Sequence, residues 1–402
     1  MRDEEGAPIA AVLALAAAAF ASGLSLRVTD PLLPRLASEF AVSLGRASDV
    51  VTFFAVAYGL SQLFFGPLGD RFGKVLVIAW ACVACTASAA LCALAPGFEV
   101  LVAARLLAGA TCAAVIPLSM AWIGDVVPYG QRQPVIARFL IGQIMGVAAG
   151  QLVGGLAAEH ASWRVPFIGL AILFAVVAAI LFAVVKRLPA HARRTIQVEG
   201  HAFVRVFREF WLVASQPWPR TVLVTVFLEG MFIYGAFAFI ASHLYRTYSI
   251  SLAAAGAIVM LFGLGGFLFA AFSSWFVRRY GEVGLIVRGG ALAGAGLAWI
   301  ALGGGWAWAI PACTILGLGF YMLHNTLQTN ATQMSPERRG AAVSSFASLL
   351  FLGQAAGVAL AGLAVEQFGT GVAIATGGLG VIAVAMAFAG LKRRREYHSY
   401  PQ

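Results

Sequence analysis

Long apolar stretches alternate with short polar segments along the whole chain. Each stretch has about the twenty residues that an α-helix needs to cross the hydrocarbon core of a bilayer. The alternation of polar and apolar neighbours that marks a membrane β-barrel is not visible. The pattern predicts an all-α membrane protein with twelve transmembrane helices, over residues 8–31, 47–69, 75–95, 100–124, 135–157, 165–186, 220–243, 253–277, 284–304, 307–330, 341–365 and 371–391.

The longest polar interruption divides the twelve spans into two groups of six. It predicts an N-terminal six-helix bundle over residues 1–186, a cytoplasmic linker over 187–219, and a C-terminal six-helix bundle with a basic cytoplasmic tail over 220–402. Within the linker, the stretch AFVRVFREFWLVA at 202–214 is amphipathic. We expect this stretch to form a helix that lies on the inner membrane surface and ties the two bundles together.

Composition supports the membrane assignment. Hydrophobic residues make up 61% of the chain and charged residues 11%, whereas soluble domains have about 45–50% and about 25%. A soluble chain of 402 residues would form roughly two or three domains with polar surfaces. This sequence has too few polar residues to cover such surfaces, so the bilayer is its expected solvent.

The distribution of basic residues predicts the orientation of the chain. With the N-terminus in the cytoplasm, 21 of the 27 lysines and arginines fall on the cytoplasmic side, as the positive-inside rule requires. We therefore expect a multi-pass protein of a bacterial inner (plasma) membrane with both termini cytoplasmic. The net charge of +10 is spread over short loops, which argues against nucleic-acid binding.

Neither the N-terminus nor the cysteines indicate processing or a metal site. The residues before the first apolar stretch are Asp3, Glu4 and Glu5, whose charge is wrong for a signal peptide. The five cysteines all lie within predicted spans, where buried free thiols are expected. We expect no disulfide framework, no metal and no cofactor.

Short phrases recur in the two halves. GQIMGVA at 142–148 matches GQAAGVA at 353–359, and GLAAEH at 155–160 matches GLAVEQ at 362–367. Both pairs fall on the fifth predicted helix of their half. In addition, GPLGDRFGK follows the second helix and SWFVRRYGE follows the eighth, so that Gly73 and Gly281 occupy matching positions. The recurrences predict a duplicated six-helix unit, an arrangement in which transporters place the substrate between the repeats.

Four motifs resemble the major facilitator superfamily. GPLGDRFGK at 66–74 is similar to the signature between its second and third helices, and LVAARLLAGATCAA at 101–114 to its helix-4 motif. GVAAGQLVGG at 146–155 resembles its antiporter motif, and TDPLLPRLASEF at 29–40 resembles the twelve-span drug:proton antiporter branch. The resemblance covers nearly the whole chain. It implies two pseudo-symmetric six-helix bundles, alternating access and a monomeric transporter.

One position departs from the antiporter motif, which has proline where this chain has Gln151. Proline removes a backbone hydrogen bond and helps a helix to bend, whereas glutamine keeps the bond and adds a polar side chain. The surrounding glycines still permit close helix packing. The residues of this expected packing motif are Gly146, Gly150, Gln151, Gly154 and Gly155.

Ionisable residues are costly inside a membrane and therefore mark functional positions. Within the predicted spans they concentrate on the first, fourth, seventh and tenth helices, which line the central cavity in the resembled family. The candidate proton-coupling and substrate residues are Arg27, Asp30, Arg105, Glu229, Tyr234, Tyr321, His324, Asn325 and Gln328.

Glu229 has two possible roles. It is either a carboxyl held protonated by burial and bonded to a neighbour such as Tyr234, or a proton carrier that releases its proton when water or a cationic substrate arrives. Asp30 could pair with Arg27 or, across the cavity, with Arg105. This pair could bind substrate or could be purely structural. His324 is expected to be a hydrogen-bonded cavity residue rather than a relay.

The signature between helices 2 and 3 is expected to act as a gate at the cytoplasmic surface. Asp125 could pair with Arg71, and Asp70 could lie at the N-terminus of the eleventh helix, where negative charge is favoured. These contacts would close the cytoplasmic side. The expected gating residues are Gly66, Gly69, Asp70, Arg71, Gly73, Lys74 and Asp125.

The leading functional prediction is proton-coupled export of small, partly apolar compounds. An importer or facilitator of sugars or organic anions is the alternative, since Arg27 and Arg105 suit an anion and Gln151 weakens the antiporter motif. An enzyme is not expected, because no HExxH, GxSxG or metal-ligand cluster occurs. The expected partners are a small-molecule substrate, protons and the lipid bilayer.

Overall fold

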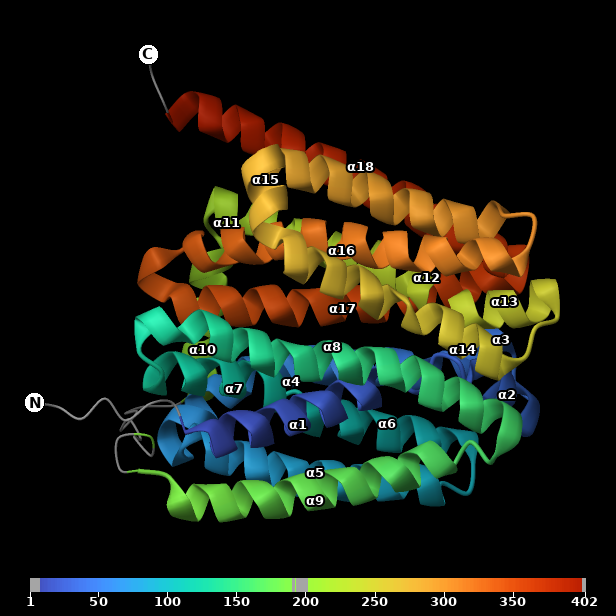
Figure 1. Ribbon diagram of the computed structural model, residues 1–402, viewed down its shortest axis with the longest axis horizontal. Coiled ribbons are helices and arrows are strands. Elements are labelled where there is room, and N and C mark those ends of the chain that lie inside the picture. The colour runs from blue at the N-terminus through green and yellow to red at the C-terminus, as the bar shows by residue number, and fades with distance from the viewer. Residues whose placement is uncertain (1–7, 190–191, 193–201, 400–402) are drawn as a thin grey trace, which may run out of the picture.

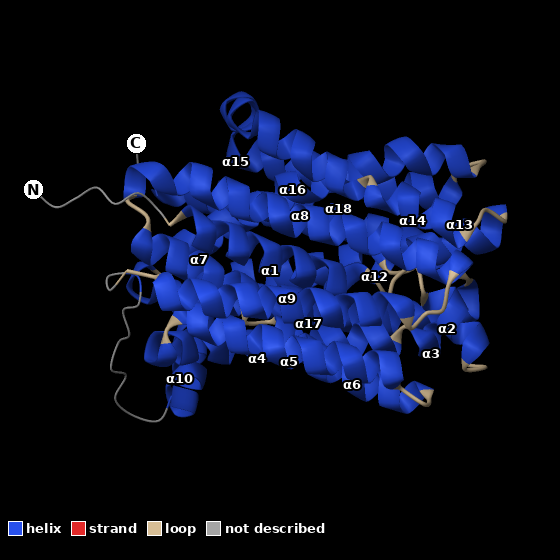
Figure 2. Cartoon of the chain, turned by 60° about the horizontal axis from the view of Figure 1, so that its bottom comes forward, coloured by secondary structure: helices blue, strands red, loops and turns tan. Residues whose placement is uncertain are grey.

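A computed structural model describes residues 8–189, 192 and 202–399, and this part of the chain contains helices and loops without strands (Figure 2). Eleven of its helical segments are long and apolar enough to cross a membrane. One of them, Leu252–Leu302, has 51 residues and is broken at Gly281, whose φ is +61°. It therefore counts as two spans, and the predicted twelve-helix membrane fold is confirmed.

The helices follow the same order in both halves. The first half comprises α1 (Ile9–Arg27), α2 (Leu33–Glu39), α3 (Leu44–Ala47), α4 (Asp49–Phe72), α5 (Lys74–Leu94), α6 (Phe98–Cys112), α7 (Val115–Val126), α8 (Tyr129–His160) and α9 (Val165–Arg187). The connecting helix is α10 (Ala202–Ala214). The second half comprises α11 (Pro217–Glu229), the π-helix η2 (Gly230–Tyr234), α12 (Gly235–Phe237), α13 (Ile240–Tyr248), α14 (Leu252–Met260), α15 (Phe262–Leu302), η3 (Trp306–Trp308), α16 (Ala309–Gln333), η4 (Pro336–Arg338), α17 (Arg339–Phe368) and α18 (Thr370–Ser399).

Two bundles lie side by side with their helices roughly parallel (Figure 1). Most buried apolar residues of α1 to α9 form one core, and those of α11 to α18 form another. We call the end where α1 begins and α18 ends the termini end, and the end that holds α2, α3 and α13 the loop end. Trp80, Ile172 and Leu379 expose 61%, 61% and 71% of their surface on the outside of the bundles, as lipid contact requires.

The amphipathic stretch of the linker forms α10, at the termini end. The ring of Phe207 lies 5.9 Å from that of Phe64 in the first bundle. Oε2 of Glu209 forms a 3.0 Å ion pair with Nε of Arg338 in the second bundle. The helix therefore contacts both bundles. The linker segment 193–201 lies outside the described residues.

Backbone geometry repeats between the halves, at one of two matched positions without residue identity. Ala41 and Ser249 have φ of +52° and +53°, an uncommon conformation outside glycine. Gly73 and Gly281, which are separated along the chain by the same interval as Ala41 and Ser249, also have positive φ. The turns at the two ends of the second helix of each half are thus built alike.

The recurring phrase GQxxGVA places glycines where two helices touch backbone to backbone. A Cβ atom on Gly146 of α8 would lie 2.1 Å from the carbonyl oxygen of Phe20 in α1. A Cβ atom on Gly357 of α17 would lie 2.0 Å from the carbonyl oxygen of Met231 in η2. Since no side chain fits at either contact, both halves require glycine there.

Candidate functional site

Arg27, at the end of α1, joins the two bundles near their centre. Its side chain is 1% exposed, and its Nη2 donates a 3.3 Å hydrogen bond to Oε1 of Gln354 in α17. Its guanidinium carbon lies 4.2 Å from the ring centre of Tyr234, at the end of η2. Stacking on an aromatic face is favourable for a desolvated guanidinium. The cation of the first bundle is therefore held largely by side chains of the second.

Asp30 completes this cluster from the first bundle. Its Oδ2 lies 3.5 Å from Nη1 of Arg27 and accepts a 3.0 Å hydrogen bond from Nε2 of Gln151 in α8. Gln151 thus binds the carboxylate from the position where the antiporter motif has proline. A buried ion pair needs such added hydrogen bonds to offset the loss of water. Asp30 Oδ1, Gln151 Oε1 and Gln354 Nε2 have no hydrogen-bond partner among the described residues.

Arg105, in α6, is anchored away from Asp30. Its Nε and Nη1 donate 3.1 Å hydrogen bonds to the carbonyl oxygens of Val50 and Ser25, respectively. Its guanidinium also stacks on Phe54 at 4.1 Å. Of the two partners considered for Asp30, the structure gives Arg27. The contacts of Arg105 hold three helices of the first bundle together.

Glu229 and His324 form a second polar pair. Oε2 of Glu229 lies 3.0 Å from Nδ1 of His324 in α16, and the glutamate is fully buried. Tyr234, which was considered as a hydrogen-bond partner for a protonated Glu229, instead lies over Arg27 of the other bundle. The π-helix η2 begins at the residue after Glu229, and such segments are frequent at functional sites.

The ring of Phe320 connects the surroundings of Arg27 to the pair of Glu229 and His324. The ring of Phe320 lies 5.3 Å from that of Tyr234 and stacks on the ring of His324 at 5.0 Å. Tyr321 packs beside it against Phe262, at 5.9 Å. The group formed by Arg27, Asp30, Gln151, Tyr234, Gln354, Phe320, His324 and Glu229 is named the central cluster below.

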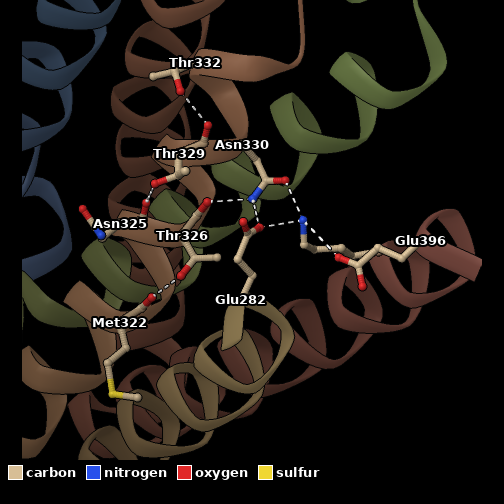
Figure 3. Close-up of polar contacts among 9 residues, drawn as sticks. Glu282, Met322, Asn325, Thr326, Thr329, Asn330, Thr332 and Glu396 are labelled. Carbon is tan, nitrogen blue, oxygen red and sulfur yellow. Dashed lines mark hydrogen bonds and ion pairs between the residues drawn. The ribbon is translucent and has the colours of Figure 1, made fainter. Parts of the chain in front are cut away.

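Four predicted cavity residues lie outside the central cluster: Arg105 and Tyr321, described above, and Asn325 and Gln328. Asn325 and Gln328 of α16 are exposed, and the carbonyl oxygen of Asn325 accepts a 2.9 Å hydrogen bond from Thr329 (Figure 3). Gln354, by contrast, belongs to the cluster although it was missing from the predicted site. Its position in GQAAGVA, the second copy of the repeated phrase, was the available signal.

The predicted gate residues lie at the termini end, with Lys74 at their centre. Its Nζ lies 2.7 Å from Asp70 and 2.8 Å from Asp125 at the end of α7. Lys74, rather than Arg71, therefore pairs with Asp125, and the Arg71 guanidinium lies over the ring of Phe72 at 5.1 Å. Gly73 makes the positive-φ turn between α4 and α5.

The other two gate glycines have different surroundings. A Cβ atom on Gly69 would lie 2.5 Å from a methyl carbon of Leu118 in α7, so glycine permits close packing there. A Cβ atom on Gly66 would meet nothing within 4 Å.

The second bundle carries a charge-reversed counterpart of this contact. Glu282, which follows Gly281 as Lys74 follows Gly73, accepts a 2.7 Å ion pair from Lys392 of α18 and a 3.2 Å hydrogen bond from Asn330 of α16 (Figure 3). Lys392 also donates to Asn330 at 3.0 Å. Lys392 follows the last predicted span and was assigned to the basic cytoplasmic tail, and Asn330 is not among the predicted site residues. The match between Gly73 and Gly281 in the two copies of the repeat could have located Glu282, because Glu282 then corresponds to Lys74.

An apolar cavity of about 460 Å³ lies between α1, α8 and α9. Its lining contains no residue of the central cluster and no charged side chain. Ligand sites combine apolar walls with a few polar anchors, so the central cluster is the better candidate.

Comparison with known proteins gives consistent matches. The sequence profile of the Major Facilitator Superfamily matches residues 15–350. The chain is 27% identical over 354 residues to the uncharacterized MFS-type transporter YceJ of Bacillus subtilis (strain 168), covering 85% of this chain and 86% of that protein. It is 29% identical over 158 residues to the multidrug export protein EmrB of Haemophilus influenzae, covering 39% of this chain and 31% of that protein.

Among solved structures, a bacterial homolog of the human lysosomal transporter Spinster, in an inward-facing and unoccupied conformation, superposes with a TM-score of 0.75. The alignment covers 97% of this chain and 98% of that one at 19% identity. At this identity the likeness shows the fold alone.

Proposed function

Because the chain belongs to the major facilitator superfamily, we propose that it exports small, partly apolar compounds in exchange for protons. Membrane transport is the activity of the family, and the direction, coupling ion and substrate class are parts of this proposal. The termini end faces the cytoplasm of a bacterial cell, in line with the charge of its loops. The export name of EmrB supports the direction.

The observation that carries the proposal is the pair of Glu229 and His324. A fully buried carboxylate is unstable unless it is protonated or paired, and here the pairing partner is itself a titratable base. Burial favours the protonated carboxyl, whereas water or a positively charged group favours the ionised one. Opening of the bundles to one side or the other would change that balance, so Glu229 can take up a proton on one side and release it on the other.

The Arg27–Asp30 pair is assigned to substrate binding. It bridges the bundles through Gln354 and Tyr234, so its contacts change when the bundles move. The aromatic rings between it and His324 supply apolar surface for a partly apolar substrate. Substrate and proton therefore act on one connected group of side chains.

The test is Glu229→Gln, which removes the titrating group and keeps the size of the side chain. Everted membrane vesicles energised to an acidic interior would be incubated with external ethidium, chloramphenicol or norfloxacin as cationic, neutral and zwitterionic probes. We expect accumulation of at least one probe by the parent and an at least tenfold loss in the variant, by analogy with the loss of a general acid or base.

Glu337→Gln is the matched control, since that glutamate is 87% exposed. The variant should insert in equal amount and transport as the parent does. Proton-driven accumulation in Glu229→Gln equal to that of Glu337→Gln would exclude the role of Glu229.

Import of an organic anion is a second candidate, and the central position of Arg27 favours it. Arg27 is the cation that contacts both bundles within the described central cluster. Benzoate uptake into right-side-out vesicles with an acidic exterior, in excess of the passive uptake by vesicles without the protein, would support import. Probe accumulation in everted vesicles alone would support export.

A further inference from the structure

The second recurring phrase, GLAxE, lies where the two bundles meet at the loop end. Its copies are Gly155 to Glu159 near the end of α8 and Gly362 to Glu366 near the end of α17. In each copy the glycine precedes the glutamate by one helical turn, so both lie on the same face of the helix. In each copy that face meets the opposite bundle.

In the first copy, α8 meets α14 of the second bundle. Oε2 of Glu159 accepts a 2.9 Å hydrogen bond from the backbone N–H of Leu252, the first residue of α14. A Cβ atom on Gly155 would lie 2.5 Å from the carbonyl oxygen of Leu252. A Cβ atom on Gly256, one turn along α14, would lie 2.4 Å from the carbonyl oxygen of Gln151.

In the second copy, α17 meets α3 of the first bundle. Oε1 of Glu366 accepts a short hydrogen bond from the hydroxyl of Ser43, the residue that caps α3. A Cβ atom on Gly45 would lie 2.5 Å from that same carboxylate oxygen. A Cβ atom on Gly362 would lie 3.0 Å from Oγ of Ser48.

The two contacts are related by the repeat. Ser43 and Ser251 occupy equivalent positions in the two halves, and each caps the helix that follows it. Each glutamate therefore accepts a hydrogen bond from the start of a helix of the other bundle, Glu159 from a backbone N–H and Glu366 from the capping hydroxyl. At the termini end, by contrast, Gly66 of α4 has no atom within reach of an added Cβ.

From these contacts we propose that Glu159 and Glu366 are a pair of symmetric latches that hold the loop end of the molecule closed. Each latch joins the C-terminal turn of a helix in one bundle, α8 or α17, to the start of a helix in the other bundle, α14 or α3. Opening of the loop end breaks both hydrogen bonds and separates both glycine contacts, whereas contacts within each bundle are kept. The latches set the balance between the loop-end-closed and loop-end-open states, whatever compound the protein carries.

The experiment measures the separation of the bundles directly. Nitroxide labels are attached to cysteines introduced by Ser38→Cys in α2 and Thr247→Cys in α13, both exposed at the loop end, and the five native cysteines are buried. Double electron–electron resonance in lipid nanodiscs then gives the distance distribution. This readout does not depend on proton coupling or export, so it can fail or succeed independently of the proposed function.

The latch variants are Glu159→Gln, Glu366→Gln and the double variant. Glutamine keeps an acceptor oxygen and loses the charge, so each single change replaces a charge-assisted hydrogen bond by a weaker neutral one and should raise the ratio of long to short distances by about fivefold. The double variant should raise it on the order of twentyfold if the separate sites add. Glu39→Gln is the matched control, since Glu39 pairs with Arg35 of its own helix, α2.

Glycine variants give an independent route to the same state. Gly45→Ala and Gly256→Ala insert a methyl group into the two contacts and should also lengthen the distances, whereas Gly97→Ala, where nothing lies within 4 Å, should not. The proposal is overturned if the glutamine variants keep the distribution of Glu39→Gln, whether or not the alanine variants open the loop end.

Discussion

At the scale of single residues, the two buried arginines have different surroundings although each is 1% exposed. Arg105 bonds to backbone carbonyl oxygens of its own bundle, and these acceptors cannot move away without distorting helices. Arg27 contacts side chains of the other bundle, and those can separate. The first arrangement stabilises a bundle, and the second depends on how the bundles are placed.

Replacement of each arginine by lysine should separate these roles. Lysine keeps the charge and loses the planar fork that reaches several acceptors. Arg105→Lys should lower stability by about 2 kcal/mol, since buried acceptors lose their donor, and Arg27→Lys should lower stability less while reducing transport. Thermal unfolding in detergent, followed by tryptophan fluorescence, measures the first effect and vesicle transport the second. Equal losses of stability would contradict the distinction.

The sequence predicts the members of the central cluster better than their pairings. Arg27, Asp30, Glu229, Tyr234 and His324 stand out because lipid excludes such groups. The partner of Tyr234, however, is an arginine in the other half of the chain, and no local pattern indicates a contact across the bundle interface. Gln354 was overlooked because an uncharged amide is a weaker signal than a charge within a span.

At the scale of elements, the glycine contacts between α1 and α8 and between η2 and α17 make each pair of helices a unit. Carbonyl oxygens of one helix lie directly against glycines of the other, at Gly146 and at Gly357. Such contacts have no side chain that could adopt another rotamer. Each pair is therefore expected to move as one body.

Gly146→Ala and Gly357→Ala test the helix pairs. The added Cβ would meet a backbone oxygen at 2.1 Å and 2.0 Å, respectively, so the helices must shift, at a cost of about 1–3 kcal/mol each. Gly124→Ala in α7 is the control, because nothing lies within 4 Å and alanine favours a helix. Thermal unfolding should rank the control at or above the parent and both test variants below it. A control that unfolds with them would contradict the packing argument.

At the scale of the whole molecule, the twelve-helix fold can be predicted from the sequence, but the closure of the loop end cannot. The hydropathy pattern predicts twelve spans, and the break at Gly281 within α15 falls between the predicted spans 253–277 and 284–304. The closed loop end depends instead on Glu159 and Glu366, which lie at helix ends where charged residues are ordinary. Their pairing across the bundles could not be read from either helix alone.

The separate cores imply that the bundles can fold from two chains. Co-expression of residues 1–192 with residues 202–402 should yield a complex, since few buried apolar residues are shared between the two cores. Division between α5 and α6 should not, because it splits the first core. Co-purification through a tag on one fragment measures both cases. Recovery of the second pair as efficiently as the first would contradict the assignment of one core to each bundle.

The left-handed corners at Ala41 and Ser249 carry a consequence for how such proteins diverge. The two positions share a bend but no residue type, and neither uses the amino acid that adopts that bend most easily. The two halves thus share a backbone conformation at a position where their side chains differ. Distant copies of this six-helix unit can therefore be sought by comparing backbone torsion angles at such turns, where a sequence alignment would show no matching residue.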